Sequence, residues 1–568
     1  MYVRLAFCGL VSALALSSAF VGCGSSDQTS DDAGTGSTSD GTPTGDDSTS
    51  PGGDSGLGSS SGASSSGGSS SGGLDGAAPS RDGGAHADAG PVAYDPSVLQ
   101  HHKNGTRNGL YIDPVFSTTA AATTHVLSTF LGTTSTNVYA QPLYVENGPG
   151  GKPAFIVATG SNHVTAYDAT SGATLWDKGP ETYGPTVTTG CAPTVLGITG
   201  TPFIDYSSGQ GVIYFDAVSP ASKTPVKHLV YAVKVTDGTI LPSWPVDVSA
   251  VLPEFVSTHQ NQRGALQLVN GVLYVPYGGY NGDCTPYFGW VIGFPLASPQ
   301  TPTGWHTSAS KGGIWGPGAL PTDGTSVFPI TGNTAASGNT WGGGEAVIRL
   351  TAGPKFSGMP ADYYAPTNWK NLDNGDVDLG GASEVIFDMP GAPKPHLIAA
   401  GGKDANLYLL DRDNLGGIGT TTGTELLKQS VANNELKGAP AVYTTSKGTY
   451  VVFHVEGGGG LACPNKGTGN IVAVKIATAA SGFTATVAWC SADGGLGSPM
   501  VTTTDGTSNP IVWAASDHLY AYDGDTGTRI VDGTKTAMAS GVQGWNTPIN
   551  AKGKIAVGVN GQLYVFTP

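Results

Sequence analysis

Few residues of the sequence have a type and spacing that could do chemistry on their own. Once two cysteines near the N-terminus are set aside, four remain: Cys191, Cys284, Cys463 and Cys490. An even number of cysteines in an oxidising compartment predicts two disulfides, and three pairings are possible. We favour Cys463 with Cys490, which bracket one repeat unit, and Cys191 with Cys284 by elimination. None of the four has the CxxC spacing of a zinc site, so metal ligation is the weaker alternative.

Other reactive patterns are absent or out of context. Gly58-Ser-Ser-Ser-Gly62 has the GxSxG spacing of a nucleophile elbow, but it lies in low-complexity sequence with no strand before it and no helix after it. There is no HExxH motif, no CxxCH motif for a covalently attached haem, and no carboxylate pair whose spacing supports a hydrolase or lyase. A net charge of −16 disfavours nucleic acid as a partner.

The N-terminal segment has the features of an export signal. Arg4 precedes an apolar stretch that continues to Val21, which is too short to be a dependable membrane span. The following Gly22-Cys23 resembles the lipobox of bacterial lipoproteins, in which the cysteine is diacylated, although Phe20 stands where leucine is usual. We therefore expect residues 1–22 to be a lipoprotein signal peptide and Cys23 to carry a lipid anchor, with an ordinary signal peptide as the alternative. Gly24 is not an aspartate retention signal, which favours the outer membrane.

The next segment, residues 23–92, consists mostly of Ser, Gly, Asp and Thr with almost no large apolar side chain. Such a segment cannot bury enough surface to offset its conformational entropy. It is predicted to be a disordered tether.

An internal repeat follows the tether. Each unit opens with a small residue or proline before apolar residues. The eight openings are Ala140-Gln-Pro-Leu-Tyr-Val, Gly200-Thr-Pro-Phe-Ile-Asp, Arg263-Gly-Ala-Leu-Gln-Leu, Gly318-Ala-Leu-Pro-Thr-Asp, Gly381-Ala-Ser-Glu-Val-Ile, Gly438-Ala-Pro-Ala-Val-Tyr, Gly497-Ser-Pro-Met-Val-Thr and Asn546-Thr-Pro-Ile-Asn. Several units then carry a strand that ends in an aspartate turn, such as the one at Asp168. The spacing predicts four-stranded antiparallel blades in an all-β, eight-bladed propeller.

The last unit lacks its outer strand, because the sequence ends at Pro568. We expect residues 126–131 to supply that strand and to close the ring without an exposed edge. Trp176, Trp244, Trp305 and Trp489 lie near the ends of outer strands, where packing between blades is the expected role.

The repeat resembles that of pyrroloquinoline quinone (PQQ) propellers, the fold of quinoprotein alcohol dehydrogenases, over most of residues 103–568. The chain is particularly similar to a group of exported bacterial proteins with PQQ-like repeats, which has no assigned reaction. This similarity lies in the segments that begin at His102, Tyr139 and Gly197.

Further matches to the dehydrogenases imply a site. Trp315, in Gly-Gly-Ile-Trp-Gly, resembles the tryptophan that stacks under the quinone, and Asn333, in Thr331-Gly-Asn-Thr, resembles the asparagine that binds calcium. Asp376 or Asp378 resembles the aspartate that takes the proton from the alcohol. Lys403 resembles the basic residue that holds the quinone oxygens.

Two departures from the family pattern concern the same site. The adjacent cysteines that roof the quinone in those enzymes are absent. The nearest acid for the remaining calcium ligand is Asp283, beside Cys284. Each matched residue also has a structural interpretation: axis packing for Trp315, turn formation for Asn333 and the aspartates, and charge neutralisation for Lys403.

These observations support two functions and leave open whether the protein is an enzyme. The first is a lipid-anchored binding or scaffold propeller of the cell envelope, with a protein or glycan as partner, similar to the lipoprotein that assists assembly of outer-membrane β-barrels. That factor is a shorter chain and lacks the long loops at Cys284 and at residues 334–344. The alternative is a PQQ- and calcium-dependent dehydrogenase of alcohols or sugars.

Overall fold

The computed structural model describes residues 96–568 except 189–194, 221–225, 281, 282, 284, 336, 337, 458–462, 465–468, 481, 493, 494 and 496. The predicted signal peptide, the predicted lipidation site Cys23, the predicted tether, Cys191 and Cys284 lie outside the described residues. Among the residues described, no helix is long and apolar enough to cross a membrane.

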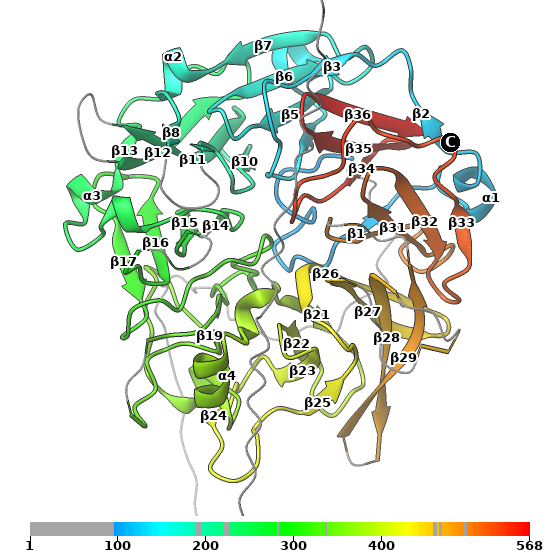
Figure 1. Ribbon diagram of the computed structural model, residues 1–568. Coiled ribbons are helices and arrows are strands. Elements are labelled where there is room, and N and C mark those ends of the chain that lie inside the picture. The colour runs from blue at the N-terminus through cyan, green and yellow to red at the C-terminus, as the bar shows by residue number, and fades with distance from the viewer. Residues whose placement is uncertain are drawn as a thin grey trace, which may run out of the picture. The chain divides into compact units, whose positions relative to one another are not determined.

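Eight of the sheets in the described residues are arranged as blades around a common centre (Figure 1), as the repeat predicts. The first four are blade 1, β4 (Leu143–Val145), β5 (Ala154–Ala158), β6 (Val164–Asp168) and β7 (Thr174–Lys178); blade 2, β10 (Phe203–Asp205), β11 (Val212–Pro220), β12 (Val226–Lys234) and β13 (Val246–Asp247); blade 3, β14 (Gln267–Val269), β15 (Val272–Tyr277), β16 (Trp290–Pro295) and β17 (Thr303–His306); and blade 4, β18 (Ile330–Thr331), β19 (Ala346–Ile348), β20 (Tyr363–Ala365) and β24 (Gly417–Ile418).

The other four complete the ring. They are blade 5, β21 (Val385–Asp388), β22 (His396–Gly401), β23 (Asn406–Asp411) and β25 (Leu427–Ser430); blade 6, β26 (Leu436–Thr445), β27 (Gly448–Val455), β28 (Ile471–Ala479) and β29 (Gly482–Ser491); blade 7, β30 (Met500–Thr503), β31 (Ile511–Ala515), β32 (Leu519–Asp523) and β33 (Arg529–Val531), with β1 (Leu110–Ile112) added parallel to β30; and blade 8, β34 (Ile549–Ala551), β35 (Lys554–Val559) and β36 (Gln562–Thr567), with β2 (His125–Val126) and β3 (Gly132–Thr133).

Short elements fill the connections between the blades. They are the α-helices α1 (Thr118–Ala121), α2 (Pro180–Tyr183), α3 (Val248–Val251) and α4 (Trp369–Gly375), the 3₁₀ turns η1 (Pro149–Gly151), η2 (Ser257–His259), η3 (Pro360–Asp362) and η4 (Leu379–Gly381), and the strand pair β8 (Val187–Thr188) and β9 (Val195–Leu196).

The strands read as continuous apolar runs because both faces of each blade are covered. In β5, Phe155 packs in one core cluster with strands of blade 8, whereas Ile156 packs in another with strands of blade 2. The aspartate turn after β6 forms as expected: the Asp168 carboxylate accepts the backbone N–H of Thr170 and of Ser171. The core is therefore a series of apolar layers, one between each pair of blades.

The residues that open each unit tie neighbouring blades together around the channel. A small side chain there lets the backbone of one blade approach the next. The eight hydrogen bonds, in order around the ring from blade 8, are Asn546 Nδ2 to Ala140 O, Gln141 N to Thr201 Oγ1, Leu266 N to Thr201 O, Ala265 N to Pro317 O, Gly318 N to Ser383 Oγ, Ser383 N to Gly438 O, Ala439 N to Ser498 Oγ and Ser498 N to Asn546 O.

Ring closure is confirmed, with a change of detail. β2 and β3 both pair with β36, so the chain near the start of the propeller completes blade 8. The pairing is split into 125–126 and 132–133 rather than running along 126–131. Between the two strands, Phe130 is buried against Phe155 of blade 1, which draws the backbone away from β36.

The predicted opening of blade 4 at Gly318 is displaced. Residues 318–323 do not form a regular strand, and only Thr322 makes a β-bridge, to Val327. The first strand of this blade with a regular pairing is β18, which pairs with β19. Ala319 and Leu320 have positive φ angles, which interrupts an extended strand there. The other openings lead into β4, β10, β14, β21, β26, β30 and β34.

Two further expectations are confirmed. Cys463 and Cys490 form a disulfide. The four tryptophans contact the following blade: Trp176 Nε1 donates to Val235 O, Trp489 Nε1 donates to Gly524 O, Trp244 packs against Phe294, and Trp305 packs against Phe356.

Candidate functional site

Asp378 lies where three of the residues singled out from the sequence meet. Its side chain is buried, with Oδ1 accepting the backbone N–H of Asn333 at 2.7 Å. Its Oδ2 lies 2.5 Å from Lys403 Nζ. The structure therefore brings Asn333, Asp378 and Lys403 into direct contact.

Asp376 and Asp378, the two aspartates between which the sequence does not choose, have different surroundings. Asp376 follows α4 in a left-handed conformation (φ 54°), and 69% of its side chain is exposed. It also pairs with Lys403, at 3.1 Å. Only Asp378 is both buried and in contact with Asn333, so it is the better placed of the two to act on a ligand beside Asn333.

Trp315 lies against the same cluster, and glycine makes this approach possible. A Cβ on Gly332 would be 2.3 Å from Trp315 Cζ3 and 2.5 Å from Asp378 Oδ1. Gly278 and Gly313 contact the indole in the same way, since a Cβ on either would lie within 2.7 Å of a ring atom. All four matched positions therefore converge.

Strand direction explains why these residues share one face of the ring. In an antiparallel blade, the connection into the first strand and the hairpin between the second and third strands lie at the same end. Asp378 precedes β21, and Lys403 lies in the hairpin between β22 and β23. In blade 4, Thr322 bridges antiparallel to Val327, so residues 318–322 take the place of the first strand and β18 belongs to the second. The hairpin between β18 and β19, which carries Asn333, therefore lies at the end where the chain enters the blade after Trp315.

Asp283 makes its contacts outside this cluster. It accepts a hydrogen bond from Tyr287 Oη at 2.7 Å and pairs with Lys311 at 2.9 Å. The Tyr287 ring meets Trp315 edge-on, with centroids 6.0 Å apart. Asp283 thus reaches Trp315 through Tyr287, and in the described part of the chain it makes no hydrogen bond to Asn333.

Glu345 is a member of the site that the sequence did not single out. It is fully buried, and its Oε2 accepts the Leu379 N–H at 2.5 Å, next to Asp378. Burial raises the pKa of Glu345 well above its usual value, and the nearby Asp378 carboxylate adds to the effect. Glu345 Oε1 and Asn333 Oδ1 are buried without a hydrogen-bond partner in the described structure. The only sequence signal was a lone acid after Gly342-Gly-Gly344.

Arg263 and Trp545 also belong to the site, and the sequence motifs did not identify either of them. Arg263 Nε donates to Trp315 O at 2.9 Å, and its guanidinium lies 4.0 Å from the centre of the Trp545 ring, a cation–π contact from blade 3 to blade 8. Burial lowers the pKa of Arg263 to about 10. Trp545 has a φ of 76°, which is costly for a bulky residue. Arg263 was noted only as the first residue of an opening.

The site combines acidic side chains with buried oxygen atoms. Burial raises the pKa of Asp378, although the Lys403 charge opposes the rise. Asp373 accepts two hydrogen bonds from Thr334, at 2.7 and 3.0 Å. Over the described ranges there is no group of at least three His, Cys, Asp or Glu residues arranged to hold a metal. An ion here would therefore need the Asn333 amide oxygen in addition to carboxylates.

The comparisons with known proteins concern the fold. No family model matches the sequence, and no curated protein sequence does. Among solved structures, the quinohemoprotein alcohol dehydrogenase of Comamonas testosteroni superposes with a TM-score of 0.54 at 13% identity, covering 84% of this chain and 81% of that one. The quinohemoprotein alcohol dehydrogenase ADHIIG of Pseudomonas putida HK5 gives 0.55 at 12% identity, covering 83% and 80%. A europium-containing methanol dehydrogenase gives 0.55 at 13% identity, covering 83% and 98%. The chain thus has the eight-bladed fold of the quinoprotein dehydrogenases.

Proposed function

We propose that this propeller binds PQQ together with calcium at the cluster around Asp378 and oxidises an alcohol or a sugar. The observation that carries the proposal is the convergence of Trp315, Asn333, Asp378 and Lys403 at one end of the channel. These positions belong to two blades and are far apart in the sequence.

The donor atoms fit the proposed groups. Calcium prefers oxygen ligands, and Asn333 Oδ1 and Glu345 Oε1 are buried oxygens without a partner in the described structure. Asp378 accepts the Asn333 N–H, and Glu345 accepts the N–H of the adjacent Leu379, so the three side chains would supply the oxygen donors. The Trp315 indole supplies a flat face for a planar ring. When bound, the quinone supplies the acceptor for the hydride that leaves the substrate carbon.

Asp378 is the proposed base. Its carboxylate, held by the Asn333 N–H and by Lys403, would accept the proton of a substrate hydroxyl. Lys403 Nζ, held by two carboxylates, places a positive charge at the same end of the channel, where it favours negative charge that develops on a nearby oxygen. Asp376, at the exposed edge, helps to hold Lys403 in position.

A second candidate function is a tethered binding module of the cell envelope, exported and anchored through Cys23. The observation that favours it is that Lys403 is neutralised by Asp376 and Asp378 within the protein itself. The missing cysteine pair agrees with this alternative. In that case the cluster fixes the loops at the channel mouth and binds no cofactor.

Titration of the purified protein with PQQ and Ca²⁺ separates the two functions. A ligand that binds only the folded state raises stability by RT ln(1 + [L]/Kd), about 2.7 kcal/mol at a hundredfold excess over Kd. We expect a higher melting temperature with both ligands, and reduction of a dye in the presence of alcohols or aldoses. An unchanged melting temperature at saturating PQQ and Ca²⁺ would exclude the dehydrogenase.

Asp378→Asn then tests the assignment of the base. The amide keeps the shape but cannot accept the proton, so kcat should fall at least about a hundredfold while PQQ still binds. Asp413→Asn, in an exposed ion pair with His396, is the matched control and should leave kcat unchanged. Equal turnover in Asp378→Asn and the unmodified protein would rule out this residue as the base.

A further inference from the structure

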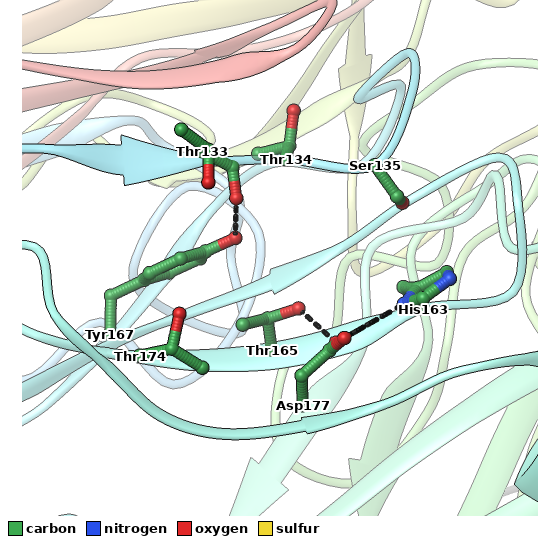
Figure 2. Close-up of a pocket in the computed structure, with 8 residues that line it drawn as sticks. All are labelled: Thr133, Thr134, Ser135, His163, Thr165, Tyr167, Thr174 and Asp177. Carbon is green, nitrogen blue, oxygen red and sulfur yellow. Dashed lines mark hydrogen bonds and ion pairs between the residues drawn. The ribbon is translucent and has the colours of Figure 1, made fainter.

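A polar pocket lies where the strand that closes the ring meets blade 1. Its volume is about 270 Å³, and eight residues line it. Figure 2 shows Thr133, Thr134 and Ser135, at β3 and directly after it, facing residues of β6 and β7. Of the eight residues, six carry a hydroxyl group, and the other two are His163 and Asp177.

The walls of the pocket are fixed by bonds among the lining residues. Thr165 Oγ1 donates to Asp177 at 2.6 Å, and His163 Nδ1 lies 3.1 Å from the same carboxylate (Figure 2). Tyr167 Oη donates to the Thr133 carbonyl at 2.5 Å, which ties β6 to β3. The Asp177 carboxylate is therefore held in one orientation at the pocket wall.

Several polar groups remain available to a ligand. The hydroxyls of Thr133 and Thr174 and the Nε2 atom of His163 have no hydrogen-bond partner in the described part of the protein. Asp177 keeps 43% of its side chain exposed, although it already accepts two bonds. The pocket thus offers one fixed carboxylate acceptor with hydroxyl groups on both sides.

The charge and shape of the lining exclude several classes of ligand. An anion would meet the Asp177 carboxylate, and the lining contains no lysine or arginine to offset that charge. One carboxylate is too few for a Ca²⁺ ion, which takes six to eight oxygen ligands. Tyr167 is buried, so its ring offers no stacking face to an aromatic ligand. A neutral ligand with several hydroxyl groups satisfies all of these conditions.

We propose that this pocket binds a neutral saccharide or polyol, with Asp177 accepting hydrogen bonds from adjacent ligand hydroxyls and Thr133 and Thr174 completing the contacts. His163 lies in the hairpin between β5 and β6, the counterpart of the hairpin that carries Lys403. The proposal does not depend on the cofactor, because no lining residue belongs to that site.

The pocket also links ligand binding to closure of the ring. One wall belongs to β3, which pairs with β36 of blade 8, and the opposite wall belongs to blade 1. A ligand that contacts both walls holds the closing strand against blade 1. Binding should therefore raise the melting temperature of the whole propeller.

Calorimetry and thermal melting of the full-length protein, without added PQQ, test the proposal. The probes are D-glucose and sorbitol, with inorganic phosphate and Ca²⁺ as charged comparisons. We expect saturable binding of a neutral probe and a higher melting temperature. Asp177→Asn should weaken that binding about tenfold, the effect of losing a charged hydrogen-bond acceptor. The doubly substituted Thr133→Val, Thr174→Val protein should weaken it by about as much, because methyl groups replace two hydroxyls.

Asp413→Asn is the matched control, since Asp413 pairs with His396 at 2.9 Å on the protein surface but does not line the pocket. It should bind the probes as the unmodified protein does. Absence of saturable binding of both neutral probes would overturn the proposal. So would equal affinity in correctly folded Asp177→Asn, or tighter binding of phosphate than of glucose. Saturable binding of glucose, together with a melting temperature that PQQ and Ca²⁺ do not change, would support the saccharide pocket and refute the dehydrogenase.

Discussion

At the scale of single residues, Gly332 determines how closely Trp315 and Asp378 approach each other. It lies between Thr331 at the end of β18 and Asn333, and its φ is not in the left-handed region. Alanine is therefore disfavoured there only by contact: its methyl group would overlap the Trp315 ring and the Asp378 carboxylate. A substitution at Gly332 therefore tests side-chain packing at the site without adding backbone strain.

Gly332→Ala should displace Trp315 and disturb the Asp378 and Lys403 pair. We expect the free energy of unfolding to fall by about 1–3 kcal/mol, as in other overpacked sites, and PQQ binding to weaken. Gly541→Ala is the control, because a Cβ there has only ordinary contacts, the nearest at 3.6 Å. Denaturant unfolding and tryptophan fluorescence measure both effects. Unchanged stability and an unchanged spectrum in Gly332→Ala would show that the indole does not lie against this glycine.

The residues found from sequence and those missed differ in how they reach the site. Trp315, Asn333 and Lys403 lie in short motifs that resemble known motifs, so each was recognisable locally. Glu345 and Trp545 acquire their role only when blades 4 and 8 are brought to the axis. A lone acid after glycines and a tryptophan before an opening have many structural explanations in a linear sequence. The sequence could not distinguish Asp376 from Asp378, because the two differ in burial, and burial depends on the folded structure.

At the scale of elements, neighbouring blades are joined by polar contacts as well as by apolar layers. Asp216 on β11 and His228 on β12 are both buried, with Oδ1 and Nδ1 2.8 Å apart. Tyr277 on β15 of blade 3 donates to Asp216 Oδ2 at 3.0 Å. His228 Nε2 lies 2.9 Å from Gln260 O, so both ring nitrogens face acceptors, which favours the protonated imidazole.

This pair predicts a pH dependence of stability. Burial alone would lower the pKa of His228, but the Asp216 carboxylate raises it above the usual value of 6.5. The folded state therefore binds the proton more tightly than the unfolded state. The stabilisation is fully present below about pH 6.5 and is lost as the pH rises through the folded pKa. We expect the free energy of unfolding to fall over that interval.

Asp216→Asn should remove this dependence and lower the free energy of unfolding by about 3–5 kcal/mol at acidic pH, because it leaves a buried charge unpaired. Asp413→Asn, in the exposed pair, should change it by less than about 1 kcal/mol. Urea unfolding between about pH 5 and 9 provides the measurement. A pH profile for Asp216→Asn that parallels the unmodified profile would assign the dependence to another group.

Element boundaries show how far the repeat pattern determines the fold. Seven openings lead into the first strand of a blade because proline or a small residue before β-branched residues is a local signal. At Gly318 the same signal is present, yet positive φ angles at Ala319 and Leu320 break the strand. Those angles follow from tertiary contacts, since a Cβ on Gly264 would lie 2.5 Å from the Ala319 Cβ. Local sequence cannot report such a constraint.

At the scale of the whole molecule, the segment from Val98 to Asp113 lies at the centre of the ring. It forms at least one backbone or side-chain hydrogen bond with each of the eight blades. Figure 1 shows this early part of the chain at the centre of the ring. In blade order, the contacts are the Val98 bridge to Tyr144, Ile204 N to Leu99 O, Arg107 Nη2 to Leu266 O, Thr322 N to Gly105 O, Ile386 N to Thr106 O, Val442 N to Asn108 O, the β1 pairing with β30, and Asn550 Nδ2 to Asp113 Oδ2.

Arg107 is the centre of that segment. Its side chain is buried and also donates to Gln100 Oε1, at 3.0 Å, and to His101 O, at 2.9 Å. Glu384 of blade 5 is fully buried nearby, and both of its carboxylate oxygens lack a hydrogen-bond partner within the described structure. Burial raises the pKa of Glu384 to about 8, and the Arg107 charge opposes that rise. The buried Arg107 guanidinium thus links the segment to the blades around it.

Arg107→Met therefore tests whether the axial segment holds the ring together. Methionine fills similar space but leaves several buried carbonyl and amide oxygens without a donor and Glu384 without its cation. The free energy of unfolding should fall by about 3–5 kcal/mol, measured by guanidinium unfolding. Lys535→Met, at an exposed position, is the control and should stay within about 0.5 kcal/mol of the unmodified protein. Because the lost bonds join the segment to the adjacent blades 3 and 4, inside one closed ring, the transition should remain a single cooperative one at lower denaturant. A change smaller than about 1 kcal/mol in Arg107→Met would mean that the blades close the ring without the segment at its centre.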